Sequence, residues 1–129
     1  MTLECHDCLS MVLMLREMHA ATDVPQDVSE IVTQIKLLVD YMRHCPTRVM
    51  AAQVMDVCML TLLRTKEMMM IRGKFTVEST EYAGLIHAVL EIFDELVAQN
   101  RSDVLDDALL ALLVEDQDVR VTVLYTKNL

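Results

Sequence analysis

The chain has 129 residues and a formal net charge of −9, with 20 acidic residues against 11 basic ones. A chain this acidic repels the phosphates of DNA and RNA, whose binding depends on Lys and Arg, so a nucleic acid is not expected as the main partner. Its only glycines, Gly73 and Gly84, cannot form a glycine-rich phosphate-binding loop, and we expect no cofactor.

The composition favours one domain rich in regular structure. Hydrophobic residues make up 53% of the chain. Arg16, Asp56 and Arg64 interrupt the longest apolar runs, so none reaches the length of about 18 residues that spans a membrane. Glu4 and Asp7 stand where a secretory signal would be basic. We therefore expect a soluble intracellular protein, in the cytoplasm or nucleus, with no membrane contact.

Two helices are predicted in the first third of the chain. Residues 3–20 form a helix with a wide apolar face. Residues 28–42 carry apolar side chains at the three-and-four spacing of a helix with one buried face. Asp27 and Glu30 are spaced as a capping box at its start. Cys45-Pro46-Thr47 ends this helix at a tight corner, because proline suits the first turn of a new helix.

The middle of the chain predicts a central helix. From residue 48 to about residue 70 apolar side chains occur nearly all round the helix, as in an element buried on most sides. Arg72-Gly73-Lys74 stops it. Residues 75–77 could form a short extended piece, and Ser79 or Thr80 can cap the next helix.

The last third predicts two or three helices. One apolar stripe runs from Tyr82 to Val97, and this helix ends near Asn100. Ser102 is the expected cap of a fifth helix, which carries leucines on one face. Residues 119–129 have a β-branched composition that would suit a strand, but their context favours a helix.

That context is the leucine-rich run Leu109-Leu110-Ala111-Leu112-Leu113, followed by Asp116, Asp118, Val119 and Arg120. It resembles the turn between the two helices of a HEAT repeat, in which the first helix ends in leucines, the turn holds two aspartates and a Val-Arg pair opens the second helix. The resemblance is clearest over residues 103–129 and weaker over residues 28–63. It implies a scaffold built of stacked helix pairs.

We accordingly predict an all-α fold of five to six antiparallel helices. They form either a short helical-repeat, HEAT-like array or an irregular helical bundle, because paired helices must stack to bury their stripes. Residues 1–129 form a single α-helical domain, which a longer helical-repeat protein could contain.

Cys5-His6-Asp7-Cys8 has the spacing of one half of a zinc site. A second close pair of ligands with typical spacing is missing, so we expect no metal and interpret these cysteines as two partly buried thiols one helical turn apart. Cys58 lies in an apolar helix, where thiols are usually buried and reduced.

His87 is the candidate catalytic base, with Glu91 and Asp94 one and two turns later. No nucleophile is placed for it in the sequence, and an amphipathic helix produces the same spacing. A solvated histidine is therefore the preferred interpretation, and we do not expect an enzyme.

Eleven methionines are an unusually large share. Methionine fills irregular cores and also lines adaptable grooves for partner helices, and both interpretations stay open. Met68, Met69 and Met70 are consecutive, and consecutive helical residues point about 100° apart, so at least one should face solvent.

Charge is segregated along the chain. Basic residues dominate residues 43–74, whereas residues 78–118 are strongly acidic and contain Arg101 as their single Lys or Arg. A solvated helix face explains such a run, and so does complementarity to a basic partner segment or head-to-tail association of copies.

We predict a non-enzymatic intracellular interaction module or adaptor that binds a helical or extended segment of another protein through an apolar Met and Leu surface flanked by charge. The alternative is an obligate homo- or hetero-oligomeric structural subunit. A small enzyme using His87 and carboxylates is a third candidate. The expected contact residues are Met68, Met69, Met70, Arg72 and Lys74, followed by Asp103, Asp106 and Asp107.

Overall fold

A computed structural model describes residues 3–21, 27–71, 73 and 80–128. These residues form six α-helices and no strand, so the predicted all-α fold is confirmed. The predicted extended piece at residues 75–77 and the Ser79 cap lie outside the described residues. The helices are α1 (Leu3–Ala20), α2 (Val28–Arg43), α3 (Arg48–Ile71), α4 (Thr80–Ala98), α5 (Ser102–Glu115) and α6 (Gln117–Lys127).

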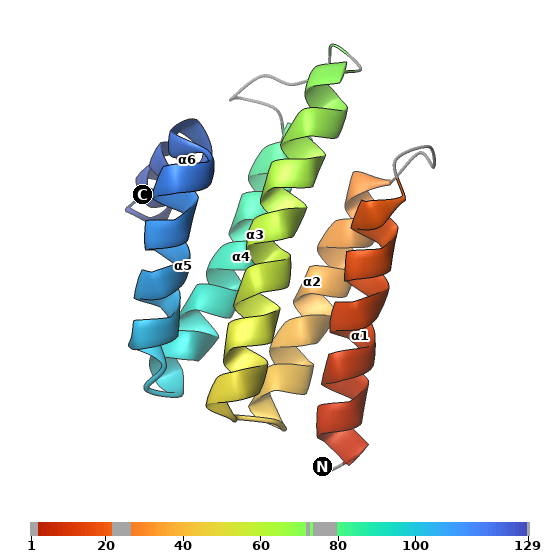
Figure 1. Ribbon diagram of the computed structural model, residues 1–129, viewed down its shortest axis with the longest axis vertical. Helices are drawn as coiled ribbons and strands as arrows, with labels where there is room; N and C mark the ends of the chain where they lie inside the picture. Colours follow the sequence, from red (N-terminus) through yellow and green to blue (C-terminus); the bar gives the residue numbers. More distant parts are fainter. Residues whose placement is uncertain (1–2, 22–26, 72, 74–79, 129) are drawn as a thin grey trace.

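The helices α1 to α5 run alternately up and down, and α6 lies beside the upper end of α5, so that the six helices pack as three hairpins in two layers (Figure 1). One layer consists of α1, α3 and α5, and the other of α2, α4 and α6. Neighbours within each layer contact one another, as do the two helices of each hairpin. The hairpin of α5 and α6 therefore forms one end of the array, and that of α1 and α2 the other.

The core runs between the two layers, and α3 lies at its centre. As its apolar composition predicts, α3 contacts α1, α2, α4 and α5 and buries side chains over most of its circumference. Tyr82 of α4 is buried against it, and its hydroxyl donates a hydrogen bond to the main-chain carbonyl of Leu62 at 3.0 Å. His19 of α1 is also buried, with its Nε2 atom 2.8 Å from the hydroxyl oxygen of Thr61.

Side-chain caps and a left-handed residue define the helix ends. The Asp27 carboxylate accepts a hydrogen bond from the Ser29 N–H, which confirms it as the N-cap of α2. Asn100 has a φ of 59°, and the N–H of Arg101 reaches back to the carbonyl of Leu96, as in a Schellman motif. The predicted Ser102 cap is wrong, because Arg101 occupies the N-cap position of α5 and Ser102 is already helical.

A disulfide bond joins Cys5 of α1 to Cys45 at the corner between α2 and α3. The expectation of free thiols is therefore wrong for Cys5. Packing of α1 against this corner brings the two Cα atoms within 5.1 Å, a distance that a disulfide can bridge. Cys8 and Cys58 remain free thiols and are fully buried.

Among the described helices, none combines the length and the apolar character needed to cross a membrane.

Candidate protein-interaction surface

The methionine triplet ends α3, and its members face different ways. Met70 is 58% exposed, which confirms that at least one of the three points outward, and Met68 is partly buried. Met69, also expected as a contact residue, follows Leu62 and Thr65 on the inward face and is only 4% exposed. Arg72 and Lys74, the expected basic neighbours, lie outside the described residues.

The outward face of α5 changes from acidic to apolar along the helix. Asp103, Asp106 and Asp107 are exposed on its first turns. Leu110 and Val114 follow on the same side, 63% and 84% exposed. The opposite side of α5 packs into the core through Val104, Leu105, Ala108 and Leu112. The C-terminal half of α5 is thus apolar on both its inward and its outward side. A helix at the end of a layer needs to be apolar only on the side that packs against the other helices.

Three ion pairs link the basic and acidic parts of the chain. They join Arg43 to Glu95, Arg48 to Asp103 and Lys66 to Asp116, with nitrogen-to-oxygen distances of 3.3, 2.8 and 2.8 Å. Arg48 also hydrogen-bonds Asp103 and thereby lowers the pKa of that carboxyl. Asp103 is therefore already partnered inside the molecule. Asp106 and Asp107 form no ion pair with any described residue.

Asp116 belongs to the turn that carries the HEAT-like resemblance. Its side chain accepts a hydrogen bond from the Val119 N–H and so caps α6, while Lys66 of α3 holds it at 2.8 Å. Partial burial alone would raise the pKa of Asp116, but the Lys66 and Val119 hydrogen bonds outweigh it and the pKa lies below its usual value. This aspartate fastens the α5–α6 turn to α3.

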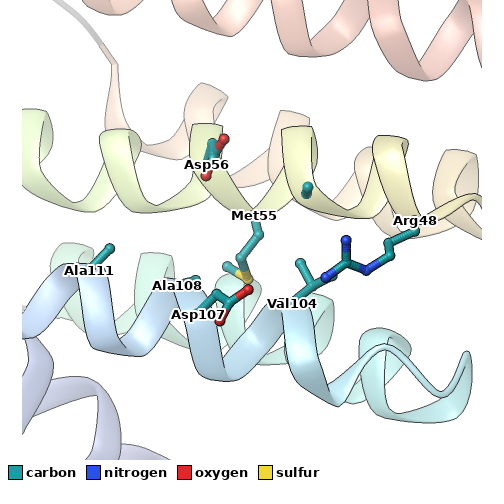
Figure 2. A pocket seen from close by; sticks show the side chains of 8 residues that line it. Arg48, Met55, Asp56, Val104, Asp107, Ala108 and Ala111 are labelled. Atoms are coloured by element: carbon teal, nitrogen blue, oxygen red, sulfur yellow. The ribbon is translucent and has the colours of Figure 1, made fainter.

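A groove of about 220 Å³ lies between α3 and α5. Figure 2 shows Met55 extending from α3 toward Ala108 of α5, with Asp56 and Asp107 carried by the two opposite helices. Both carboxylates are exposed, and neither belongs to an ion pair among the residues that the structure describes. The groove is lined by Arg48, Ala52, Met55, Asp56, Val104, Asp107, Ala108 and Ala111.

Small side chains open this groove. On α5, Val104, Ala108 and Ala111 follow one another at helical spacing, and Ala52 stands opposite them on α3. Asp107 is among the contact residues predicted from the sequence, whereas Asp56 and the groove itself are not. Val104, Ala108 and Ala111, spaced four and three residues apart on an otherwise leucine-rich helix, are the signal that could have indicated it.

His87 lines a second hollow together with Glu91, Asp94 and Lys127. It is exposed, as expected for a solvated histidine, and no hydrogen bond to either carboxylate is present in this described region. Among the described side chains, no group of three or more His, Cys, Asp or Glu residues is arranged to hold a metal ion. The geometry assembles no oriented base at His87.

Part of the chain is similar to a segment of a much longer protein. A probable serine/threonine-protein kinase of Dictyostelium discoideum is 35% identical over 82 residues, which make up 64% of this chain and 3% of that relative. The chain therefore matches a very small part of the relative's length. No protein-family model and no solved structure matches the chain, so the HEAT-like resemblance stays a prediction.

Proposed function

We propose that this protein is a non-enzymatic interaction module, an adaptor that binds a segment of another protein on the outward surface of α5 and the adjoining α3–α5 groove. The observation that carries the proposal is the second apolar side of α5. Leu110 and Val114 are 63% and 84% exposed, and such side chains next to carboxylates that pair with no described residue are typical of a docking surface.

The relative's kinase activity is not proposed for this chain. A protein kinase covers the nucleotide phosphates with a glycine-rich loop, and this chain has two glycines, eleven positions apart in the sequence at Gly73 and Gly84. The matched 82 residues make up 3% of that relative, so the proposed adaptor role rests on the α5 surface and not on the similarity.

The proposed intracellular location, cytoplasm or nucleus, has a consequence for the disulfide. Reducing compartments keep most cysteines as thiols, so Cys5 and Cys45 are expected to be reduced there for much of the protein's life. Measuring the redox state of this pair in protein trapped with an alkylating agent from cells tests the location directly.

The test of the adaptor role compares two variants, each of which replaces two exposed apolar side chains by serine. In Leu110→Ser/Val114→Ser the outward face of α5 becomes polar. In Leu13→Ser/Leu37→Ser exposed leucines change at the far end of the array, on α1 and α2. With tagged protein in a lysate of its own cells, the α5 variant should lose partners that the wild type and the α1–α2 variant retain. An identical set of bound proteins for all three would refute the proposal.

The oligomeric-subunit alternative rests on the same exposed side chains. Light scattering across concentration, at low and high salt, distinguishes it from the adaptor. An adaptor should have the mass of a monomer, 14.7 kDa, at every concentration. A dimer that survives salt, and that Leu110→Ser/Val114→Ser converts to a monomer, would establish the alternative instead.

A further inference from the structure

The α3–α5 groove has an apolar floor and an acidic rim. Ala52, Ala108 and Ala111 supply the floor together with Met55, which is 1% exposed. Asp56 and Asp107 stand on the rim. Long cationic side chains match this combination, because their methylene stems favour apolar surface while the charged head stays near water and carboxylates.

The groove continues into the apolar part of the α5 surface. Asp107, Leu110, Ala111 and Val114 are spaced three, one and three residues apart, so they share one side of the helix. A partner helix lying along α5 would therefore meet apolar side chains over the C-terminal half and carboxylates over the N-terminal half. Such anchors at helical spacing are how amphipathic helices are recognised in grooves.

The charge of the molecule selects a basic partner over a second copy. The chain carries −9, and α5 contains no Lys, Arg or His. Arg48 of α3 lines the groove but is paired with Asp103. The other basic residues of α3 are also engaged, Arg64 with Glu67 and Lys66 with Asp116. Two copies meeting at this face would bring unpaired carboxylates together, which costs free energy.

We propose that the groove between α3 and α5 binds a basic amphipathic helix, with a Lys or Arg side chain lying over the alanines between Asp56 and Asp107 and with apolar residues covering Leu110 and Val114. This inference rests on the proposed adaptor function and names the chemistry of its partner. It predicts that affinity falls as salt is added, because exposed charges are screened within about 10 Å at 0.1 M.

The probe is the designed peptide LKKLLKLLKKLLKL, labelled with a fluorophore, and binding is followed by anisotropy with the full chain. Asp56→Asn/Asp107→Asn removes both rim charges without changing side-chain shape, and both residues are exposed, so the fold is retained. Glu91→Gln/Asp94→Asn on α4 removes the same charge away from the groove and serves as the control. Circular dichroism confirms that each variant is folded.

We expect the rim variant to bind the peptide at least about tenfold more weakly, a loss of about 1.4 kcal/mol, and the control less than about twofold. Amide chemical shifts of Ala52, Ala108 and Ala111 should move on titration. Equal weakening in both variants would overturn the proposal, since it would mean attraction to net charge alone. Absence of binding to the wild type would overturn it as well.

Failure of this proposal is distinguishable from failure of the adaptor function. If the peptide does not use the groove but Leu110→Ser/Val114→Ser still loses a cellular partner, then the α5 surface docks a protein of another chemistry. If the α5 variant loses no partner either, the adaptor function itself is refuted.

Discussion

Reduction of the Cys5–Cys45 disulfide should strongly destabilise the fold. The two cysteines are 40 residues apart in sequence, and the loop that they close contains all of α2. Removing a cross-link of that span returns loop entropy to the unfolded chain, worth about 4 kcal/mol at 25 °C in the chain-entropy model. Domains of this size are stable by about 5–15 kcal/mol, so this one bond is a large share of the total.

Equilibrium unfolding in urea, with and without a dithiol reductant, measures the effect. With a urea dependence near 2 kcal/mol/M, the unfolding midpoint should fall by about 2 M on reduction. The variant Cys5→Ala/Cys45→Ala should unfold near the midpoint of the reduced wild type, and reductant should leave it unchanged. An unfolding free energy that is the same in both redox states would refute the reasoning, because it would mean that the cross-link between α1 and the α2–α3 corner adds nothing to stability.

Thiol counting provides an independent check on the pairing. The oxidised protein, denatured without reductant, should show two titratable thiols, Cys8 and Cys58. In the folded state both thiols should react slowly with alkylating agents near pH 8. Burial raises the pKa of Cys8 to about 11 and raises the pKa of Cys58 far above its usual value. The reactive thiolate form of each cysteine is therefore scarce at this pH. Four reactive thiols in the denatured oxidised protein would contradict the disulfide.

Three substitutions test individual contacts by the same urea titration. Thr61→Val removes the oxygen that hydrogen-bonds His19 in the core, and we expect a loss of about 1–3 kcal/mol. Tyr82→Phe leaves a buried carbonyl of α3 without this donor, and about 1 kcal/mol should be lost. Asp116→Ala removes the cap of α6 and the partner of Lys66, with a loss of about 1–2 kcal/mol at pH 7. Because the folded-state pKa of Asp116 is lowered, its contribution to the free energy of unfolding is present at neutral pH and is lost as pH falls below about 4. The free energies of unfolding of the wild type and the variant should therefore converge at low pH.

Much of the fold follows from local rules, which is why the sequence predicts it. Apolar spacing identified the 28–42 stripe of α2, and the all-round apolar composition of α3 correctly indicated its central place. Pro46 and Asp27 marked helix ends because their effects act within a few residues. Prediction of this kind needs no knowledge of what each helix packs against.

Features that depend on tertiary packing were not predictable in the same way. The Cys5–Cys45 bond requires α1 to lie against the α2–α3 corner, and nothing in the spacing of four cysteines specifies that geometry. Met69 and Met70 are identical side chains at adjacent positions. Met69 faces the core and Met70 faces solvent because of how α3 is rotated against the helices that it packs on. The groove likewise exists because small residues on two helices happen to face each other.

The segregation of charge along the chain shows why the sequence alone did not predict which charges a partner would contact. A basic segment followed by an acidic one is equally consistent with solvated helix faces and with a surface that binds a partner of complementary charge. The structure gives a third explanation, which is that the two segments pair with each other. The helices α2 and α3 lie beside α4 and α5. The resulting ion pairs are Arg43–Glu95, Arg48–Asp103 and Lys66–Asp116. An exposed pair such as Arg48–Asp103 adds only about 0–1 kcal/mol to stability. The larger effect of the three pairs is that these charges are already partnered inside the molecule. Asp56 and Asp107, which stand beside the apolar groove, take no part in this pairing among the described residues. Recognition in the groove should therefore depend on these two charges more than on the net charge of the chain.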